Sequence, residues 1–163
     1  MTRPTLAPRP LALLLVGTLA LAGCSSEEPA AAPATASDDS VSSKELVTDF
    51  YTQAFVEGDV AGAADEYIGD TYVQHNPQVD DGREAYVEAL APYVAEPGVE
   101  YEIARVVAED DLVVVHALNT AEGAPATAVA DIFRVEDGKI VEHWDVQQEV
   151  PAETVSGNDM VLD

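Results

Sequence analysis

Two strand-like runs that meet at an Asp-Gly turn constrain the fold of this chain more than any other feature. Residues 129–135 and 139–146 are rich in Val and Ile and are joined through Glu136-Asp137-Gly138. An Asp-Gly pair between such runs is a strong signal for a β-hairpin. The same runs contain ionisable and aromatic residues: Asp131, His143, Trp144 and Asp145. Because a carboxylate in an apolar strand is costly unless it is paired, neutral or in contact with water, the hairpin predicts a pocket.

The length of the turn decides which residues of the hairpin lie opposite one another. A three-residue turn over 136–138 places Asp131 opposite His143, whereas a two-residue turn over 137–138 places Asp131 opposite Trp144. We favour the three-residue turn, because strand alternation then gathers the ionisable groups on one face. The residues predicted on that face are Val129, Asp131, Phe133, Val141, His143 and Asp145.

The first half of the domain has the apolar spacing of helices. Ser42 and Glu45 have the spacing of a capping box, and so have Asp81 and Glu84. Three helices are therefore predicted, and Pro92 should kink or shorten the last of them. The predicted helices begin near Ser42, Asp59 and Asp81 and end near Gly58, Ile68 and Ala95.

Beyond Gly98 the sequence changes to runs of β-branched residues with strand-like spacing. Strands are predicted over 99–107, 112–119, 126–135 and 139–148. Helices followed by an antiparallel meander predict the α+β class and a single domain over residues 44–163.

The N-terminus has the pattern of a bacterial lipoprotein signal. Arg3 and Arg9 precede an apolar run over residues 11–21, which ends in Leu21-Ala22-Gly23-Cys24. We expect residues 1–23 to be a signal peptide and Cys24 to carry the lipid, a palmitate-type anchor on the extracytoplasmic face of the cell membrane. Plain secretion is the main alternative. Residues 24–43 are rich in Ala, Pro, Ser and acids, which predicts a disordered tether.

The charge of the chain restricts its partners. It has 7 Lys and Arg against 31 Asp and Glu, a net charge of −24, and removal of residues 1–23 with their two arginines leaves −26. Such a chain repels phosphate backbones, so we expect no nucleic-acid partner. We also expect no metal, because no pair of His or Glu residues has the spacing of ligands, and no cofactor motif is present. The three histidines are His75, His116 and His143, and His116 is expected in the core.

Several segments accompany the hairpin and together resemble one known family. They are residues 67–77 with their Tyr-Val-Gln-His-Asn-Pro run, the helix start Asp81-Gly82-Arg83-Glu84, residues 129–135, Glu142-His143-Trp144-Asp145-Val146, and the tail 150–160. This pattern resembles the SnoaL-like polyketide cyclase group of the nuclear transport factor 2-like (NTF2-like) superfamily. The resemblance implies three N-terminal helices packed on a curved antiparallel sheet, which forms an open cone around a pocket. It also implies a homodimer formed through the sheet.

The resemblance further implies cofactor-free chemistry by a pocket carboxylate. By motif, Asp145 corresponds to the base and Asp131 to a second polar residue on the preceding strand, and His143 could orient an aspartate or donate to an oxyanion. We predict these three residues as catalytic. The residues predicted to bind substrate are His75, Tyr72, Phe133 and Trp144.

Three functions remain open at this stage. The first is acid/base catalysis of aldol condensation, cyclisation or isomerisation on a small carbonyl compound. The second is binding of an apolar small molecule without turnover, and the third is a protein-interaction module. A polar group in an apolar pocket suits either of the first two. The number of ionisable groups on one hairpin face favours the first.

Overall fold

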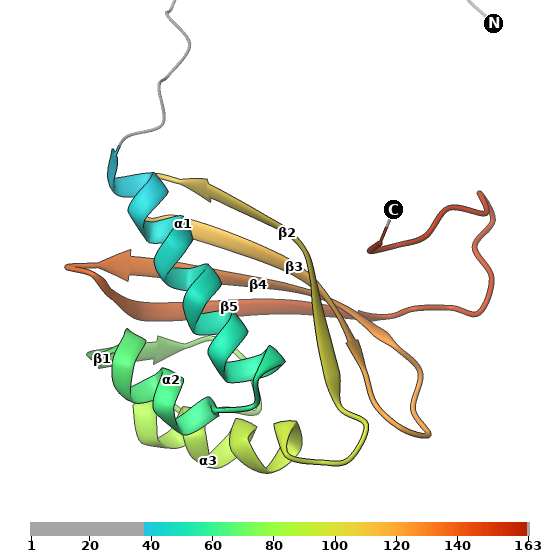
Figure 1. Ribbon diagram of the computed structural model, residues 1–163, viewed down its shortest axis with the longest axis horizontal. Coiled ribbons are helices and arrows are strands. Elements are labelled where there is room, and N and C mark those ends of the chain that lie inside the picture. The colour runs from blue at the N-terminus through green and yellow to red at the C-terminus, as the bar shows by residue number, and fades with distance from the viewer. Residues whose placement is uncertain (1–37, 163) are drawn as a thin grey trace, which may run out of the picture. The chain divides into compact units, whose positions relative to one another are not determined.

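Three α-helices pack on a five-stranded sheet in the computed structural model, which describes residues 38–162 (Figure 1). The elements are α1 (Asp38–Tyr51), the π-helix η1 (Thr52–Val56), α2 (Val60–Tyr67), β1 (Ile68–Gln74), α3 (Arg83–Val94), β2 (Glu100–Glu109), β3 (Leu112–Thr120), β4 (Thr127–Glu136) and β5 (Lys139–Glu149). This order confirms the predicted α+β class. The predicted signal peptide, Cys24 and most of the predicted tether lie outside the described residues.

The strands form one sheet in the order β1-β5-β4-β3-β2. The last four make an antiparallel meander, as predicted, and their bounds agree with the predicted ones within two residues. β1 was not among the four predicted strands, and it pairs in parallel with β5. Its sequence includes Gly69 and Asp70, residue types that are depleted in strands, so local propensity does not indicate it.

The hairpin of β4 and β5 has a different register from the predicted one. Glu136 pairs with Lys139 across a two-residue turn, in which Asp137 and Gly138 both have positive φ (51° and 72°). That turn type matches the twist of the flanking strands. An irregularity after Arg134 then shifts the pairing, so that Asp131 lies opposite Asp145.

The new register keeps the predicted residues on one face. Relative to the predicted pairing, the partner of Asp131 moves by two residues, from His143 to Asp145. Side chains on a strand alternate with a period of two, so a shift of two leaves the facing unchanged. Val141 is the exception, because it falls at the irregularity and has no partner on β4.

The helix starts show two differences from the prediction. α1 begins at Asp38, before the predicted helix start near Ser42; the sequence there is Asp-Asp, and acidic residues favour the first turn of a helix. α3 is capped by Gly82 rather than by Asp81, whose carboxylate accepts a hydrogen bond from the Gln74 backbone N–H (2.8 Å). The cap of α2 agrees with the prediction, since Asp59 accepts from the Gly62 N–H (3.0 Å).

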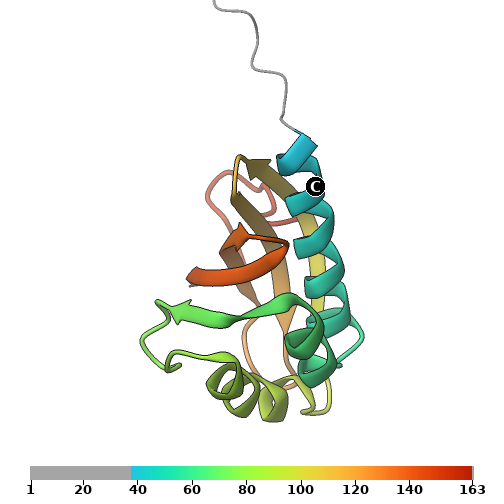
Figure 2. The ribbon, with the colours of Figure 1, turned by 90° about the vertical axis from the view of Figure 1, so that its left-hand side faces the viewer.

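The core lies between the helices and the inward face of the sheet. Phe50 and Tyr51 of α1 are fully buried and meet Phe133 of β4 edge to face, at ring distances of 5.6 and 6.4 Å. Figure 2 shows α1 along one side of the sheet and α2 with α3 below it. None of the described helices is long and apolar enough to cross a membrane. This arrangement leaves a cavity beside the inward-facing residues of β4 and β5.

Candidate functional site

A cavity of about 530 Å³ lies against the inward face of the sheet. Its volume is in the range of small-molecule sites. The end of β1, helix α3 and the inward residues of β2 to β5 form its walls. Its polar residues are Gln74, Asn76, Gln78, Asn119, Asp131, His143, Asp145 and Gln147; its aromatic residues are Phe55, Tyr86, Tyr93, Tyr101 and Phe133. No Lys or Arg is among the lining residues, all of which are in the described part of the chain.

Asp145 of β5 presents a carboxylate to this cavity. Its Oδ2 atom accepts hydrogen bonds from the side-chain amides of Asn76 and Gln147, each at 2.7 Å. Among the described residues, none donates to Oδ1. Two amide donors therefore hold the carboxylate in one orientation and leave its second oxygen available to a ligand.

Asp131 of β4 lies directly opposite Asp145 but is occupied by protein groups. It is 7% exposed, and it accepts from the Tyr51 hydroxyl at 2.8 Å and contacts His143 Nε2 at 3.1 Å. Burial, and after it the charge of Asp131, raises the pKa of the Tyr51 hydroxyl well above its ordinary value. The phenol is thus a permanent donor to Asp131.

The amide of Gln74 determines where the protons of His143 lie. The backbone N–H of Asn76 donates to Gln74 Oε1 at 2.9 Å, and the same oxygen lies 2.9 Å from His143 Nδ1. Because that oxygen is an acceptor, Nδ1 carries a hydrogen. The contact between His143 Nε2 and Asp131 Oδ1 then needs one proton, which resides on either atom.

The Asp131–His143 pair is therefore neutral overall. This matters for Asp145, because like charges directly opposite each other on a sheet are destabilising. Because Asp131 is hydrogen-bonded to His143 and Tyr51, it is not an unpaired charge opposite Asp145. The hydrogen bonds thus give the two aspartates different partners.

The predicted site residues divide into two groups. Asp131, His143, Asp145 and Phe133 all line the cavity, as the hairpin pattern predicts. Tyr72 is 2% exposed and lies behind the lining, where its hydroxyl accepts weakly from Gln74 Nε2 (3.4 Å).

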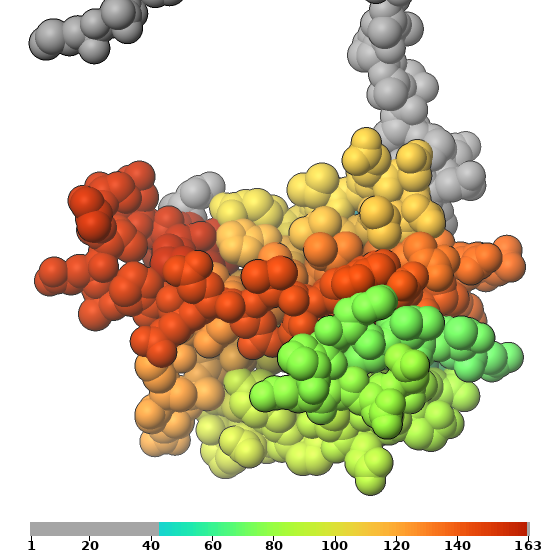
Figure 3. Space-filling view, turned by 180° about the vertical axis from the view of Figure 1, so that it is seen from behind, coloured from blue at the N-terminus to red at the C-terminus, as the bar shows by residue number. Residues whose placement is uncertain are grey.

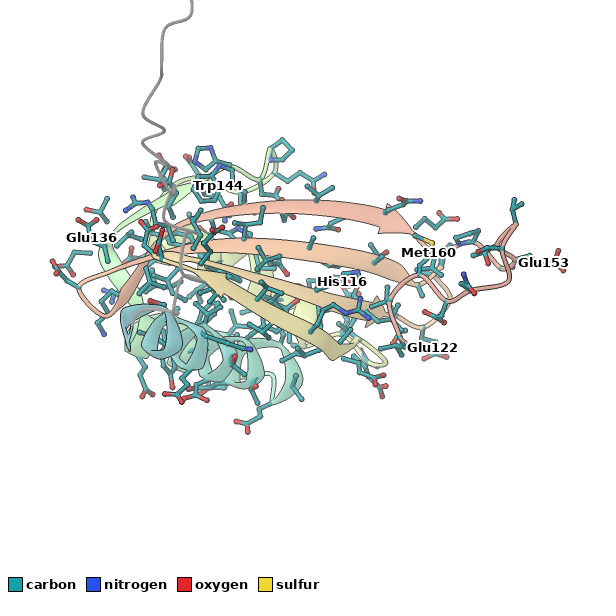
Figure 4. The ribbon with its side chains drawn as sticks, turned by 90° about the horizontal axis from the view of Figure 1, so that it is seen from above. His116, Glu122, Glu136, Trp144, Glu153 and Met160 are labelled. Carbon is teal, nitrogen blue, oxygen red and sulfur yellow. The ribbon has the colours of Figure 1, made fainter. Side chains whose placement is uncertain are left out.

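The predictions for His75 and Trp144 differ from the structure, because neither residue lines the cavity. Their rings stack on each other (4.7 Å apart, 5° between planes), and Figure 4 shows Trp144 on the opposite side of the sheet from α1. Alternation explains this, since both residues neighbour inward-facing ones. His116, expected in the core, also faces outward, where its Nδ1 contacts Arg105 Nη1 at 2.7 Å.

The sequence analysis missed the amide side chains that hold the site. Gln74 and Asn76 come from the end of β1, and Gln147 comes from β5. Alternation from Tyr72 would have placed residues 74 and 76 on the inward face and His75 on the outward one. Strand alternation is therefore the signal in the sequence that identifies Gln74 and Asn76 as inward residues.

A metal site is not apparent in the described residues. In this part of the chain, no group of three or more His, Cys, Asp or Glu side chains is arranged to hold an ion. His75 and His143 lie on opposite faces of the sheet, and His116 pairs with an arginine.

Known structures share this architecture. An NTF2-like protein of unknown function from Mesorhizobium loti matches with 22% identity over 68% of this chain and 94% of that chain, with a TM-score of 0.60. A predicted SnoaL-like polyketide cyclase from Jannaschia sp. CCS1 matches with 22% identity over 70% and 90% (TM-score 0.56). A predicted ketosteroid isomerase from Kribbella flavida matches with 17% identity over 71% and 84% (TM-score 0.56). These likenesses show the fold.

The family itself follows from the sequence match. The comparison with curated proteins gave no match. The family model described as a SnoaL-like domain matches residues 47–143, which is more than half of the chain and includes α2, β1, α3, β2, β3 and β4 in full. The chain belongs to the SnoaL-like domain family and has the NTF2-like fold.

Proposed function

We propose that this domain binds a small, uncharged carbonyl compound and catalyses proton transfer next to its carbonyl group, with Asp145 as the base. The observation that carries the proposal is the state of the Asp145 carboxylate. Asn76 and Gln147 hold its Oδ2 atom, while Oδ1 has no partner among the described residues, and Asp145 lines the cavity. A fixed carboxylate at the wall of a cavity lined by both aromatic and polar residues suits a general base.

The proposed step is balanced without any other reactant. Asp145 Oδ1 takes a proton from the carbon next to the carbonyl, and the electron pair of that C–H bond forms an enolate. The enolate then attacks a second carbonyl (aldol condensation or cyclisation), or it takes the proton back at another carbon (isomerisation). In each case the proton returns from Asp145, so the carboxylate is regenerated.

The walls of the cavity favour a ligand with an apolar body and no negative charge. Five of the lining residues have aromatic rings, which offer large apolar surfaces. The absence of Lys and Arg from the lining, together with the chain's net charge of −24, opposes carboxylate and phosphate ligands. Asp131 and His143 line the same cavity, but each already bonds to protein groups.

Deuterium exchange on a simple ketone tests this proposal. 1-Tetralone in D₂O exchanges the protons next to its carbonyl, and ¹H NMR follows their loss. We expect the wild type to accelerate the exchange and Asp145→Asn to abolish that acceleration while the far-UV circular dichroism is unchanged. Asp70→Asn is the matched control, because Asp70 is exposed and does not line the cavity. Acceleration that survives Asp145→Asn would remove the assignment of the base.

Binding without turnover is the second candidate function. It is favoured by the hydrogen bonds that occupy Asp131 and His143, which leave one of the three predicted catalytic groups free to meet a ligand. A ligand that is retained from cell-envelope extract without chemical change, combined with no exchange on 1-tetralone, would support this candidate.

The proposed place of action is the extracytoplasmic face of the cell membrane, through a lipid on Cys24. The support is the Leu21-Ala22-Gly23-Cys24 pattern after a basic and an apolar segment. A fatty-acid probe should label the wild type in cells and should not label Cys24→Ser. Equal labelling of both would leave plain secretion as the alternative.

A further inference from the structure

We propose that the cavity also binds organic cations, in which an apolar body carries an amine or a quaternary ammonium group that lies against the Asp145 carboxylate. The proposal goes beyond the proposed function, because it adds a second class of ligand for the same cavity. Three features of the lining carry it: an accessible carboxylate oxygen, a set of aromatic rings, and the lack of Lys and Arg among the described residues that form the walls.

The second oxygen of Asp145 is accessible as well as unpaired. Asn76 and Gln147 donate to Oδ2, and no described residue donates to Oδ1. In the described part of the chain, the Tyr86 hydroxyl is the one fully buried side-chain polar atom without a hydrogen-bond partner. Asp145 Oδ1 also lacks a partner and is therefore not fully buried. A small molecule can reach this oxygen, and Asp145 lines the cavity.

The other carboxylate of the lining is already paired. Asp131 accepts from the Tyr51 hydroxyl at 2.8 Å and contacts His143 Nε2 at 3.1 Å. Among the lining residues, all of which are described, His143 is the one side chain that can carry a positive charge. Its two ring nitrogens contact Asp131 and Gln74, not Asp145. Asp145 is thus the carboxylate of the cavity that a cationic ligand can pair with.

Aromatic rings of the lining offer further surfaces that attract cations. Phe55 and Tyr101 both line the cavity, and their ring centroids are 4.9 Å apart. Phe133 lies two residues from Asp131 on the inward face of β4, which makes it a diagonal neighbour of Asp145 across the hairpin. The face of an aromatic ring attracts ammonium groups, and the attraction is stronger where water is excluded.

The charges around the cavity have one sign. No Lys or Arg is among its lining residues, which are all described, and the whole chain has a net charge of −24. Burial raises the pKa of the Tyr101 hydroxyl above its ordinary value, and the charges of Asp131 and Asp145 are among the further causes. Tyr101 therefore stays neutral while its ring lies in the field of the carboxylates. Such a field concentrates cations and repels anions.

A bound cation would compete with the carbonyl ligand of the proposed function. A cationic group against Asp145 Oδ1 occupies the atom that takes the proton in that reaction. Organic cations should therefore inhibit the exchange on 1-tetralone more strongly than neutral molecules of the same shape. The cavity would in this way hold two classes of ligand, of which one blocks the use of the other.

Two probes of the same shape test the proposal by binding alone. They are trimethylphenylammonium and tert-butylbenzene, which has a carbon atom in place of the charged nitrogen, and ligand-observed NMR gives their affinities. We expect the wild type to bind the cation about tenfold more tightly than the neutral probe. Asp145→Asn should reduce this preference about fivefold or more while the far-UV circular dichroism is unchanged.

Tyr101→Leu tests the aromatic part with a second variant. Leucine keeps an apolar side chain at this position and removes the ring, so the preference for the cation should fall about two- to fourfold. The affinity for tert-butylbenzene should change less than the affinity for the cation, because the loss is specific to the charge.

Asp70→Asn is the control for charge. It removes one carboxylate from an exposed residue that does not line the cavity. It should keep the preference within about twofold, because salt screens a distant exposed charge. A preference that survives unchanged in Asp145→Asn or in Tyr101→Leu overturns the proposal. Equal loss in Asp70→Asn, equal affinities of the wild type for both probes, or no binding of the cation overturn it as well.

The binding and exchange experiments fail separately. If exchange on 1-tetralone depends on Asp145 and the cation does not bind, the base stands and the inference of a cation site is wrong. If the cation binds in a way that depends on Asp145 and the wild type causes no exchange, Asp145 is a counter-ion in a protein that does not catalyse proton transfer.

Discussion

The two faces of the sheet near β1 and β5 carry polar clusters of opposite character. The outward cluster, which we define as His75, Arg134, Glu142 and Trp144, is partly exposed. Within it, Glu142 accepts from Arg134 Nε at 2.7 Å and contacts His75 Nε2 at 2.8 Å. The inward cluster, which we define as Gln74, Asn76, Asp131, His143, Asp145 and Gln147, borders the cavity. From behind, Figure 3 shows β5 with the segment around β1 lying against it.

The difference between the clusters lies in what remains unpaired. In the outward cluster both oxygens of Glu142 are engaged, and the imidazole and indole rings cover each other. In the inward cluster Asp131 is satisfied by protein groups, whereas one oxygen of Asp145 has no donor among the described residues. His75 and Trp144, which look chemically active, are thus engaged with each other and with Glu142 on the outward face. Plain amides hold the carboxylate that borders the cavity.

The largest expected effect comes from breaking the inward cluster at Asp131. Asp131→Ala leaves the Tyr51 hydroxyl and His143 Nε2 without their partner in a buried site. Removal of one member of a buried pair costs about 3–5 kcal/mol. We expect the free energy of unfolding, measured by urea titration, to fall by that amount.

Glu142→Ala is the corresponding change in the outward cluster. It breaks two contacts as well, but partly exposed ion pairs contribute about 0–1 kcal/mol. If the two variants lose similar stability, the contrast between the faces would be wrong.

Neighbouring residues of one segment provide the second test. Asn76→Ala removes one of two donors to Asp145, a hydrogen bond to a charged group, which contributes about 1.5–3 kcal/mol. We expect the exchange rate on 1-tetralone to fall about tenfold or more. His75→Ala changes the adjacent outward side chain and should leave the rate within about twofold. Equal losses in both variants would show that the faces are not independent.

Part of this contrast was predictable because of the period of a strand. The apolar runs and the Asp137-Gly138 turn predict the hairpin, and alternation combined with the favoured three-residue turn places Asp131, His143 and Asp145 on one face. The register was not predictable in the same way, since nothing local indicates the irregularity after Arg134. The face on which these residues lie was nevertheless predicted correctly, because the predicted and observed partners of Asp131 differ by two residues.

The amides of the site depend on contacts between distant segments. Asn76 and Asp145 are 69 residues apart in sequence, and they meet because β1 pairs in parallel with β5. A parallel edge strand with Gly69 and Asp70 has little local signal. Without that strand, no pattern in the sequence shows that Gln74 reaches His143 or that Asn76 reaches Asp145.

The smallest expected effect is a pH dependence that belongs to the outward cluster. The hydrogen bond with His75, and after it the one from Arg134, lowers the pKa of Glu142 from its ordinary value. A carboxyl whose pKa is lower in the folded protein adds stability above its unfolded pKa, about 4.3 for glutamate. It loses that contribution as the pH falls through the folded pKa.

Glu142→Gln should therefore cost less than about 1 kcal/mol at pH 7, and the difference from the wild type should shrink steadily below about pH 4. Urea titrations of both proteins across this range measure it. The same substitution should not change the exchange rate on 1-tetralone, because Glu142 faces away from the cavity. A difference that grows on acidification would mean that Glu142 is not held by His75 and Arg134 as the charged form. A loss of exchange would mean that the outward cluster also sets the position of Asp145.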